Sequence, residues 1–171
     1  MDGHSTTVAL YSVLVVRHSM DLNTVLVAVG PTEQNRVEAL TESVCAVAGP
    51  ADARVVLFHS FTESAFEEGV EATGHDPSDP PEPATVAGRL SSIDAMSSSV
   101  AESGIEYEIR GAIGSPKGTI LDAIDEVGAD MVFVGGRSRS PVGKAIVGST
   151  SQKVLMNAPC PVVFVRDGAK Q

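Results

Sequence analysis

The sequence has 171 residues, 43% of them hydrophobic, which suffices for one compact domain with a buried core. Twelve Lys and Arg against 22 Asp and Glu give a formal net charge of -10, which argues against binding of nucleic acid or an anionic membrane by bulk electrostatics. The longest apolar run, Val8 to Val16, is too short to span a membrane, and Cys45 and Cys160 indicate neither a disulfide scaffold nor a zinc site, so we expect a cytoplasmic protein.

Residues 1–20 stand outside the regular pattern that follows, and we predict the domain over residues 21–168. Met20 to Thr24 reads as a natural beginning just before the first strand. We therefore interpret residues 1–20 as an extension that is either disordered or the product of a misplaced start. The alternative is an added edge strand at Val8 to Val16.

The first predicted strand is Val25 to Val29, an unbroken apolar run that is typical of a strand covered on both faces. Apolar residues at helical spacing then run to Gly49-Pro50, which predicts a helix that stops there. A second buried-type strand follows at Arg54 to His59, so the three elements form a β-α-β unit. Residues 74–84 are dense in Pro, Gly and acidic side chains, and we predict an exposed, mobile connection over them.

The second half of the chain continues the alternation of helix and strand. Its apolar spacing and its Gly and Pro positions predict helices marked by Val86 to Val100, Ser115 to Val127 and Ser149 to Asn157, and strands over Ile105 to Ile109, Met131 to Val134 and Val162 to Val165. Five strands alternating with four helices predict an α/β fold, an open doubly wound five-stranded parallel sheet with helices on both faces. We expect the strand order 3-2-1-4-5, with Val25 to Val29 at the centre. Ligands of such sheets bind beyond the carboxyl ends of the strands.

The segment from Val134 to Thr150, VGGRSRSPVGKAIVGST, has the features of a ligand-binding loop. It follows a buried strand, contains four glycines, and ends in Gly-Ser-Thr at the start of a helix. Glycine lets backbone N–H groups approach a phosphate, and a helix start leaves N–H groups unpaired. Arg137, Arg139 and Lys144 add positive charge in the same loop. We predict an anion site here, and the alternative is a structural glycine-rich turn with solvated arginines.

This loop and the helix after it resemble the signature of the universal stress protein family, Gly-x2-Gly-x9-Gly-Ser/Thr. Gly135, Gly148 and Ser149 have the required spacing, and the resemblance extends over residues 23–166. It implies an open five-stranded parallel sheet and, in one branch of the family, ATP bound between the first and fourth strands. Other members bind no nucleotide. The resemblance also implies a homodimer paired through the last strand, by Val162, Val163, Phe164 and Val165.

Carrying the family's ATP contacts onto this sequence assigns residues to two sides of the ligand. The resemblance places Gly135, Ser138, Gly148, Ser149 and Thr150 on the phosphate side, with Arg137 in the same loop, and Ala28, Val29 and Ser60 on the adenine and ribose side. We add Arg139 to the phosphate side for its charge, and Gly30 to the adenine and ribose side for its position after the first strand. Two positions depart from the pattern: Ser138 replaces the second signature glycine, and Gly30 replaces an acidic residue of nucleotide-binding members. The basic loop residues would supply charge without Mg2+, so the need for Mg2+ stays open.

The leading hypothesis is therefore a homodimeric stress-response sensor or regulator that binds ATP or another anion and is not an enzyme. One rival is an interaction module that keeps the fold without a ligand. The other rival, a weak ATPase or phosphotransferase, needs a metal-binding carboxylate, which the Gly30 substitution disfavours. No residue is assigned to catalysis or to a metal.

The remaining reactive side chains are interpreted as structural. His59 ends the second strand near the expected cleft, where a lone histidine is more often packed than catalytic. Cys45 and Cys160 have no nearby base in the sequence. Only four of the basic residues are Lys, and this acidic composition fits a salt-loving host and an ordinary acidic cytosolic protein equally well.

Overall fold

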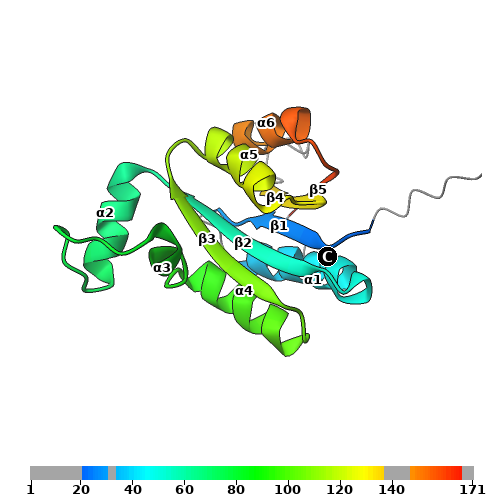
Figure 1. The fold of residues 1–171 in the computed structure, drawn as a ribbon, viewed down its shortest axis with the longest axis horizontal. Coiled ribbons are helices and arrows are strands. Elements are labelled where there is room, and N and C mark those ends of the chain that lie inside the picture. Colours follow the sequence, from blue (N-terminus) through cyan, green and yellow to red (C-terminus); the bar gives the residue numbers. More distant parts are fainter. Residues whose placement is uncertain (1–20, 31–33, 137–146, 167–171) are drawn as a thin grey trace, which may run out of the picture.

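The computed structural model describes residues 21–30, 34–136 and 147–166. They form one sheet of five parallel strands in the order β3-β2-β1-β4-β5, as expected (Figure 1). The expected extension over residues 1–20, with its alternative edge strand, lies outside the described residues. The strands are β1 (Thr24–Ala28), β2 (Arg54–Phe61), β3 (Tyr107–Ile113), β4 (Met131–Gly136) and β5 (Val162–Arg166).

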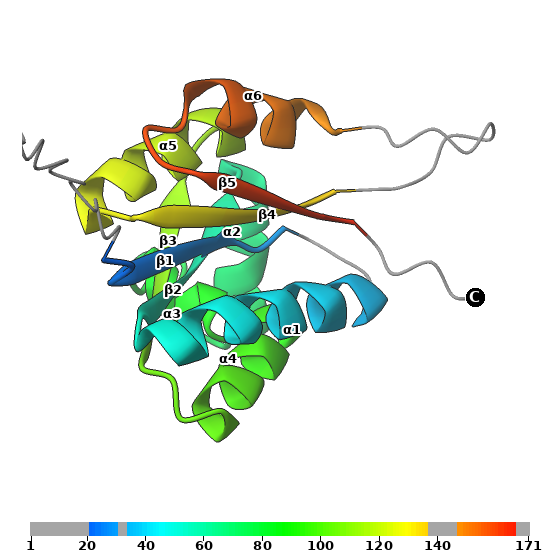
Figure 2. The same ribbon diagram turned by 90° about the vertical axis from the view of Figure 1, so that its right-hand side faces the viewer.

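Helices cover both faces of the sheet, so the predicted doubly wound architecture is confirmed. In Figure 2, α5 and α6 lie on one side of the strands, and α1 and α4 lie on the other. No helix in the described part of the chain is long and apolar enough to cross a membrane. The helices are α1 (Gln34–Ala51), α2 (Glu63–Ala72), α3 (Pro83–Ala87), α4 (Ser91–Glu102), α5 (Pro116–Val127) and α6 (Ser149–Asn157).

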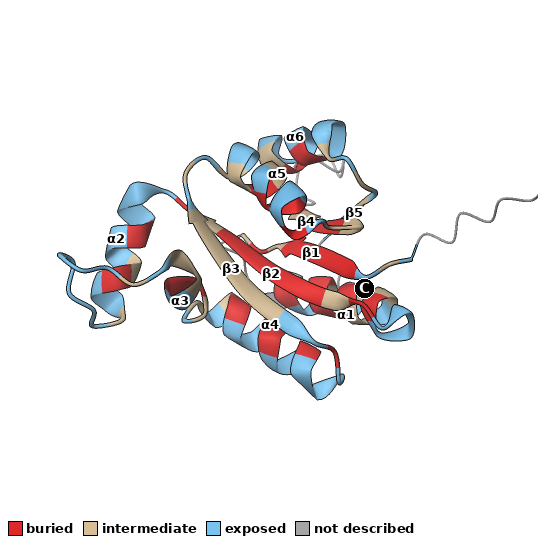
Figure 3. Cartoon of the chain, viewed as in Figure 1, coloured by how far each residue is buried: buried red, intermediate tan, exposed pale blue. Residues whose placement is uncertain are grey.

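The central strand β1 supplies both halves of the hydrophobic core, because successive side chains of a strand point to opposite faces. Val25 and Val27 pack into the cluster beneath α1 and α4, whereas Leu26 packs into the cluster beneath α5. All three side chains have 0% exposure, which explains the unbroken apolar run in the sequence. Figure 3 shows the buried band running through β1 and β2.

The helix boundaries follow the local signals closely in α5 and less closely in α1. Pro116 occupies the first turn of α5, and Gly128 ends the helix in the left-handed conformation with a φ of 61°. The helix α1 passes the predicted stop at Gly49-Pro50 and ends at Ala51. Pro50 has no N–H to donate to the carbonyl four residues earlier, and the helix ends one residue after it, where Asp52 has a φ of 54°.

The region between β2 and β3 differs most from the prediction. The expected single helix over Val86 to Val100 is divided into α3 and α4, and α2 was not predicted, so six helices are described instead of four. The spacing of apolar residues does not predict α2, because this helix buries only two side chains, Phe66 and Val70. Thr62 caps it by accepting a hydrogen bond from the backbone N–H of Ala65 at 3.2 Å.

A small separate core holds α2 and α3 together. It contains Phe61, Phe66, Val70, Val86 and Ala87. The connection predicted to be mobile over residues 74–84 contains neither helix nor strand up to residue 82, but its last two residues belong to α3. Its mobility stays a prediction.

The strand β3 begins two residues later and ends four residues later than the predicted Ile105 to Ile109. Pairing with β2 begins just before it, because the backbone N–H of Val55 donates to the carbonyl of Glu106 at 2.8 Å. Gly111 extends the strand although the sequence alternation ends before it. A β-carbon there would lie 2.6 Å from the backbone of Pro83, so the glycine lets the start of α3 pack directly on the sheet.

Candidate functional site

A cavity of about 550 Å3 lies at the carboxyl ends of the strands. In Figure 2 these ends of β1 and β4 emerge between α1 and α6. The lining residues come from three strands or their ends and from three helices or their starts: Ala28, Val29, Gly30, Arg36, Leu40, Phe58, Ser60, Pro116, Ile120, Val134, Gly135, Gly136, Gly148, Ser149, Thr150 and Ser151. This is the position at which open parallel sheets bind ligands, because the strand order reverses between β1 and β4.

The fold brings together residues that the sequence analysis assigned to two sides of a ligand. The cavity is lined by all eight of those that are described, namely Ala28, Val29, Gly30, Ser60, Gly135, Gly148, Ser149 and Thr150. The other predicted residues, Arg137, Ser138 and Arg139, lie outside the described residues, as does Lys144. A role of any of these residues in binding stays a prediction.

The polar end of the cavity is the start of α6. Gly148 is the N-cap, with φ −62° and ψ 156°, and as a glycine it has no side chain that could cap the helix. The N–H of Gln152 donates to the carbonyl of Gly148 at 2.9 Å, so the preceding N–H groups of the first turn have no partner within the helix. Such a helix start attracts anions through these N–H groups and the helix dipole.

A side-chain hydrogen bond fixes this helix start against the sheet. The hydroxyl of Ser151 donates to the carbonyl of Gly135 at 3.1 Å. Gly135 belongs to β4 and Ser151 to the first turn of α6, so the bond joins the strand and the helix at the polar end of the cavity. Sequence reasoning missed Ser151, although it follows directly after the predicted Ser149 and Thr150.

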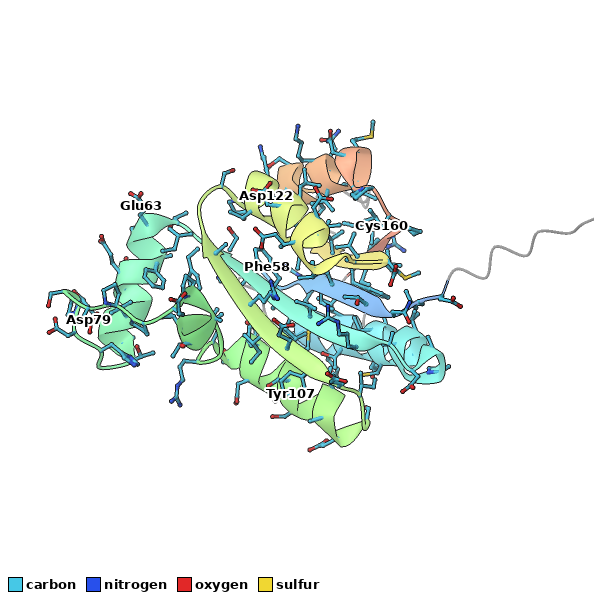
Figure 4. The ribbon with its side chains drawn as sticks, viewed as in Figure 1. Phe58, Glu63, Asp79, Tyr107, Asp122 and Cys160 are labelled. Carbon is cyan, nitrogen blue, oxygen red and sulfur yellow. The ribbon has the colours of Figure 1, made fainter. Side chains whose placement is uncertain are left out.

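Another part of the cavity wall is apolar. Phe58, Ile120 and Val134 belong to one buried cluster, and Phe58 points from β2 toward α5 (Figure 4). A continuous apolar surface of this kind suits a planar ring. Phe58 could have been found from the sequence, because it shares one face of β2 with the predicted Ser60. Ile120 could not, because its place depends on how α5 is oriented over the sheet.

Ser60 is held in place by the start of α5. Thr119 donates a hydrogen bond to the Ser60 hydroxyl at 2.7 Å, and that hydroxyl lies 3.5 Å from the carbonyl of Gly114. The Ser60 hydroxyl is thus already engaged in the protein. It retains capacity for a ligand as an acceptor, since a hydroxyl oxygen has two lone pairs.

His59 lies on the face of β2 opposite to Phe58 and Ser60, and it contacts Val29, which lines the cavity. Its Nδ1 lies 2.6 Å from the carbonyl oxygen of Val29, and its ring stacks edge-on against Phe61 with 4.5 Å between centroids. Burial lowers the pKa of His59, and the bond to Val29 opposes this shift. This geometry agrees with the interpretation of His59 as a packed residue.

Arg36 is the one charged residue among the described residues that line the cavity. It comes from the first turn of α1 and lies over Gly135, where an added β-carbon would be 3.5 Å from its Cδ. Arg36 was not among the residues predicted from the sequence. The feature of the sequence that could have identified it is its position at the start of the helix that follows the central strand.

The described lining contains no carboxylate, and the described residues contain no group of three or more His, Cys, Asp or Glu that could hold a metal. Magnesium in nucleotide sites is usually held by one or two carboxylates together with phosphate oxygens. The described residues therefore do not fit a protein-bound Mg2+. Cys160 is remote from this chemistry, and burial, followed by the charges of Asp130 and Asp125, raises the pKa of its thiol.

The chain is similar to known proteins both in sequence and in structure. A universal stress protein from Mycolicibacterium smegmatis is 38% identical over 66 residues, which are 38% of this chain and 51% of that relative, so the match spans about half of its length. The structure of a universal stress protein from Archaeoglobus fulgidus aligns with a TM-score of 0.64 at 25% identity, covering 84% of this chain and 98% of that one.

A second structure from Archaeoglobus fulgidus is described as the universal stress protein in complex with dAMP. It aligns with a TM-score of 0.59 at 20% identity and covers 84% of this chain and 97% of that one. The model of the universal stress protein family matches residues 22–166 of this chain. The chain belongs to the universal stress protein family.

Proposed function

We propose that this chain binds an adenine nucleotide in the cavity and acts as a nucleotide-dependent regulator in stress response. The observation that carries the proposal is the meeting of an uncapped helix start and an apolar wall in one cavity of about 550 Å3. This volume lies within the range of roughly 300 to 1,000 Å3 that is usual for small-molecule sites. The dAMP complex of the Archaeoglobus relative supports the same ligand class.

The two ends of the cavity assign the two ends of the ligand. The phosphate lies at the start of α6, where Ser149 and Thr150 add hydroxyl groups to the backbone N–H groups. The base lies against the apolar wall that includes Phe58 and Ile120. Gly30 and Val29 border the ligand where β1 ends.

ATP is the form of the ligand that the family resemblance implies, and we propose that it binds without a protein-held Mg2+. The described lining offers hydroxyl groups and one arginine but no carboxylate. Positive charge from Arg137, Arg139 and Lys144 is part of this proposal as a prediction, since these residues lie outside those described.

We further propose that the protein binds nucleotide without turning it over. Ser60, Ser149, Thr150 and Ser151 line the cavity, but the described lining contains no histidine or carboxylate to serve as a base for their hydroxyl groups. The rival readings are a module of this fold without a ligand and a weak ATPase.

The working form is proposed to be a homodimer joined through β5. This strand lies at the edge of the sheet, and Val162, Val163, Phe164 and Val165 are each only partly buried. An apolar edge strand presents unpaired backbone groups that favour pairing with a second copy. Light scattering at micromolar concentration is expected to give twice the monomer mass, and a monomer would refute this pairing.

Calorimetric titration with AMP, ADP and ATP, each with and without Mg2+, tests the proposed function. Binding below about millimolar without Mg2+ is the expected result. If no nucleotide binds in that range, the module without a ligand is the correct reading. Release of phosphate from ATP by the purified protein, abolished by chelation of Mg2+, would instead establish the ATPase.

A further inference from the structure

The pairing of β1 with β2 stops where the two strands reach the cavity. The last pair of the ladder is Ala28 and Phe58, and the backbone N–H of Val29 still donates to the carbonyl of Phe58 at 2.8 Å. In a parallel ladder the next bond would run from the N–H of Ser60 to the carbonyl of Val29. The pairing of the described strands ends before this step, so that bond is not made.

The side chain of His59 takes the carbonyl of Val29 instead. Its Nδ1 lies 2.6 Å from this oxygen, and since a carbonyl oxygen only accepts, Nδ1 carries the proton. The ring is held in place, because His59 is only 7% exposed and contacts Phe61 edge-on. Because the ring lies on one face of the sheet, the carbonyl is drawn out of the plane in which a ladder bond to Ser60 would form.

The backbone N–H of Ser60 is consequently unpaired within the described part of the chain. The side-chain hydroxyl of Ser60 is the group that bonds to Thr119 and approaches Gly114, so those contacts leave the backbone N–H without an acceptor. Ser60 and Val29 both line the cavity. An unpaired backbone N–H at a cavity is a donor that a ligand can use.

From this arrangement we propose that His59 is a positioning residue for ligand binding: by holding the carbonyl of Val29, it keeps the N–H of Ser60 free to donate to the base of the nucleotide. The inference rests on the proposed function and deepens it, since it names the residue that prepares the base side of the site. Ring nitrogens and carbonyl oxygens at the edge of a base are acceptors for such a donor. His59 is not among the described residues that line the cavity, so it acts only through Val29.

Two substitutions of similar shape test the hydrogen bond. Leu and Asn both branch at Cγ, but only Asn has an N–H group that can replace Nδ1. In His59→Leu the carbonyl of Val29 is released to pair with Ser60. Calorimetry is expected to show that the affinities for adenosine and for AMP fall by the same factor, about fivefold to tenfold, because both ligands present the same base. His59→Asn is expected to restore most of this affinity.

Phe61→Leu provides the matched control. It changes the packing beside the imidazole ring, with 4.5 Å between the two ring centroids in the wild type, and it leaves the bond from His59 to Val29 in place. Phe61 is not among the described residues that line the cavity. Adenosine binding by this variant is expected to equal that of the wild type.

Amide hydrogen exchange at Ser60, followed by NMR without ligand, gives a readout that a loss of packing would not produce. Pairing in a ladder protects an amide from exchange, so exchange at Ser60 is expected to be slower in His59→Leu than in the wild type. It is expected to keep the wild-type rate in His59→Asn. A general loosening of the core would make this amide exchange faster instead.

The outcomes separate the inference from the proposed function. Wild-type protein that binds neither adenosine nor AMP would overturn the proposed function and the role of His59 in binding with it. Wild-type binding that His59→Leu leaves unchanged, or that His59→Leu and His59→Asn weaken equally, would overturn the inference alone. Exchange at Ser60 that is unchanged or faster in His59→Leu would also overturn it, because His59 would then serve packing only.

Discussion

The two ends of the sheet use their polar groups differently. At the amino-terminal end, the Asp130 carboxylate accepts the backbone N–H groups of Asn23 and Thr24, each at 2.9 Å, and the Asp130 N–H donates to the Thr24 carbonyl. Arg54 adds bonds to the Thr24 hydroxyl and to Glu108. At the carboxyl end, by contrast, the N-cap of α6 is Gly148, which has no side chain to cap the first turn, and this helix start lines the cavity.

The difference separates stability from binding. Polar groups that are paired within the protein stabilise the fold, whereas groups left without an internal partner are available to a ligand. Substitutions at the amino-terminal end are therefore expected to change unfolding, and substitutions at the carboxyl end are expected to change affinity.

The largest expected effect is on stability, from Asp130→Ala. The substitution removes the acceptor of two backbone N–H groups, one of which belongs to the buried Thr24. The free energy of unfolding, measured with urea, is expected to fall by about 2 to 3 kcal/mol, while AMP affinity is kept. Asp125→Ala, on the exposed face of α5, is the control and is expected to change stability little. Equal effects of the two substitutions would contradict the role of Asp130.

The Gly148→Val substitution tests the carboxyl end of the sheet. The φ of −62° suits any residue, and a β-carbon there meets no described atom within 4 Å, so the fold is expected to be kept. The branched side chain occupies the space in front of the α6 N–H groups, and AMP affinity measured by calorimetry is expected to fall about tenfold or more. Gly118→Ala, in the first turn of α5, where a β-carbon meets no atom within 4 Å, is the control for glycine replacement and is expected to leave affinity unchanged. Undiminished AMP binding by Gly148→Val would remove the α6 start from the site.

Ser151→Ala is expected to have a smaller effect on both properties, since Ser151 joins the sheet to the ligand side of α6. Loss of its bond to the Gly135 carbonyl is expected to cost about 1 kcal/mol of stability and to weaken AMP binding severalfold. Ser99→Ala removes a comparable bond to a backbone carbonyl on α4, far from the cavity lining, and is expected to leave binding intact. A loss of stability without any loss of affinity would show that the helix start needs no such support.

The smallest expected effect is a pH dependence from His59. Burial lowers its pKa in the folded protein below the ordinary 6.5, so the unfolded chain binds more protons as the pH falls below that value. Stability is therefore expected to be complete above about pH 6.5 and to decline below it. Urea midpoints across this range measure the slope, which His59→Asn is expected to reduce and His75→Asn, at an exposed position, is expected to preserve. An unchanged slope in His59→Asn would assign the decline to other groups.

The sequence predicted the parts of the molecule in which one local signal determines the outcome. The unbroken run of β1 identified the central strand, and the Ser115-Pro116 and Gly128 signals placed α5. The helix α2 was missed because two buried side chains produce too weak a period. Arg36 was missed for another reason: its place in the cavity depends on the packing of α1 against β4, which no local pattern encodes.

The adjacent glycines at the end of β4 are glycines for unrelated reasons, and this has an evolutionary consequence. A β-carbon on Gly136 would lie 2.1 Å from the Phe164 ring, whereas one on Gly135 would make an ordinary contact with Arg36 on the other face. Residue 136 is thus expected to vary across descendants of this gene only together with residue 164. Residue 135 makes no such demand on residue 164, so any restriction on it would come from the cavity that it lines, and two neighbouring positions would carry independent histories.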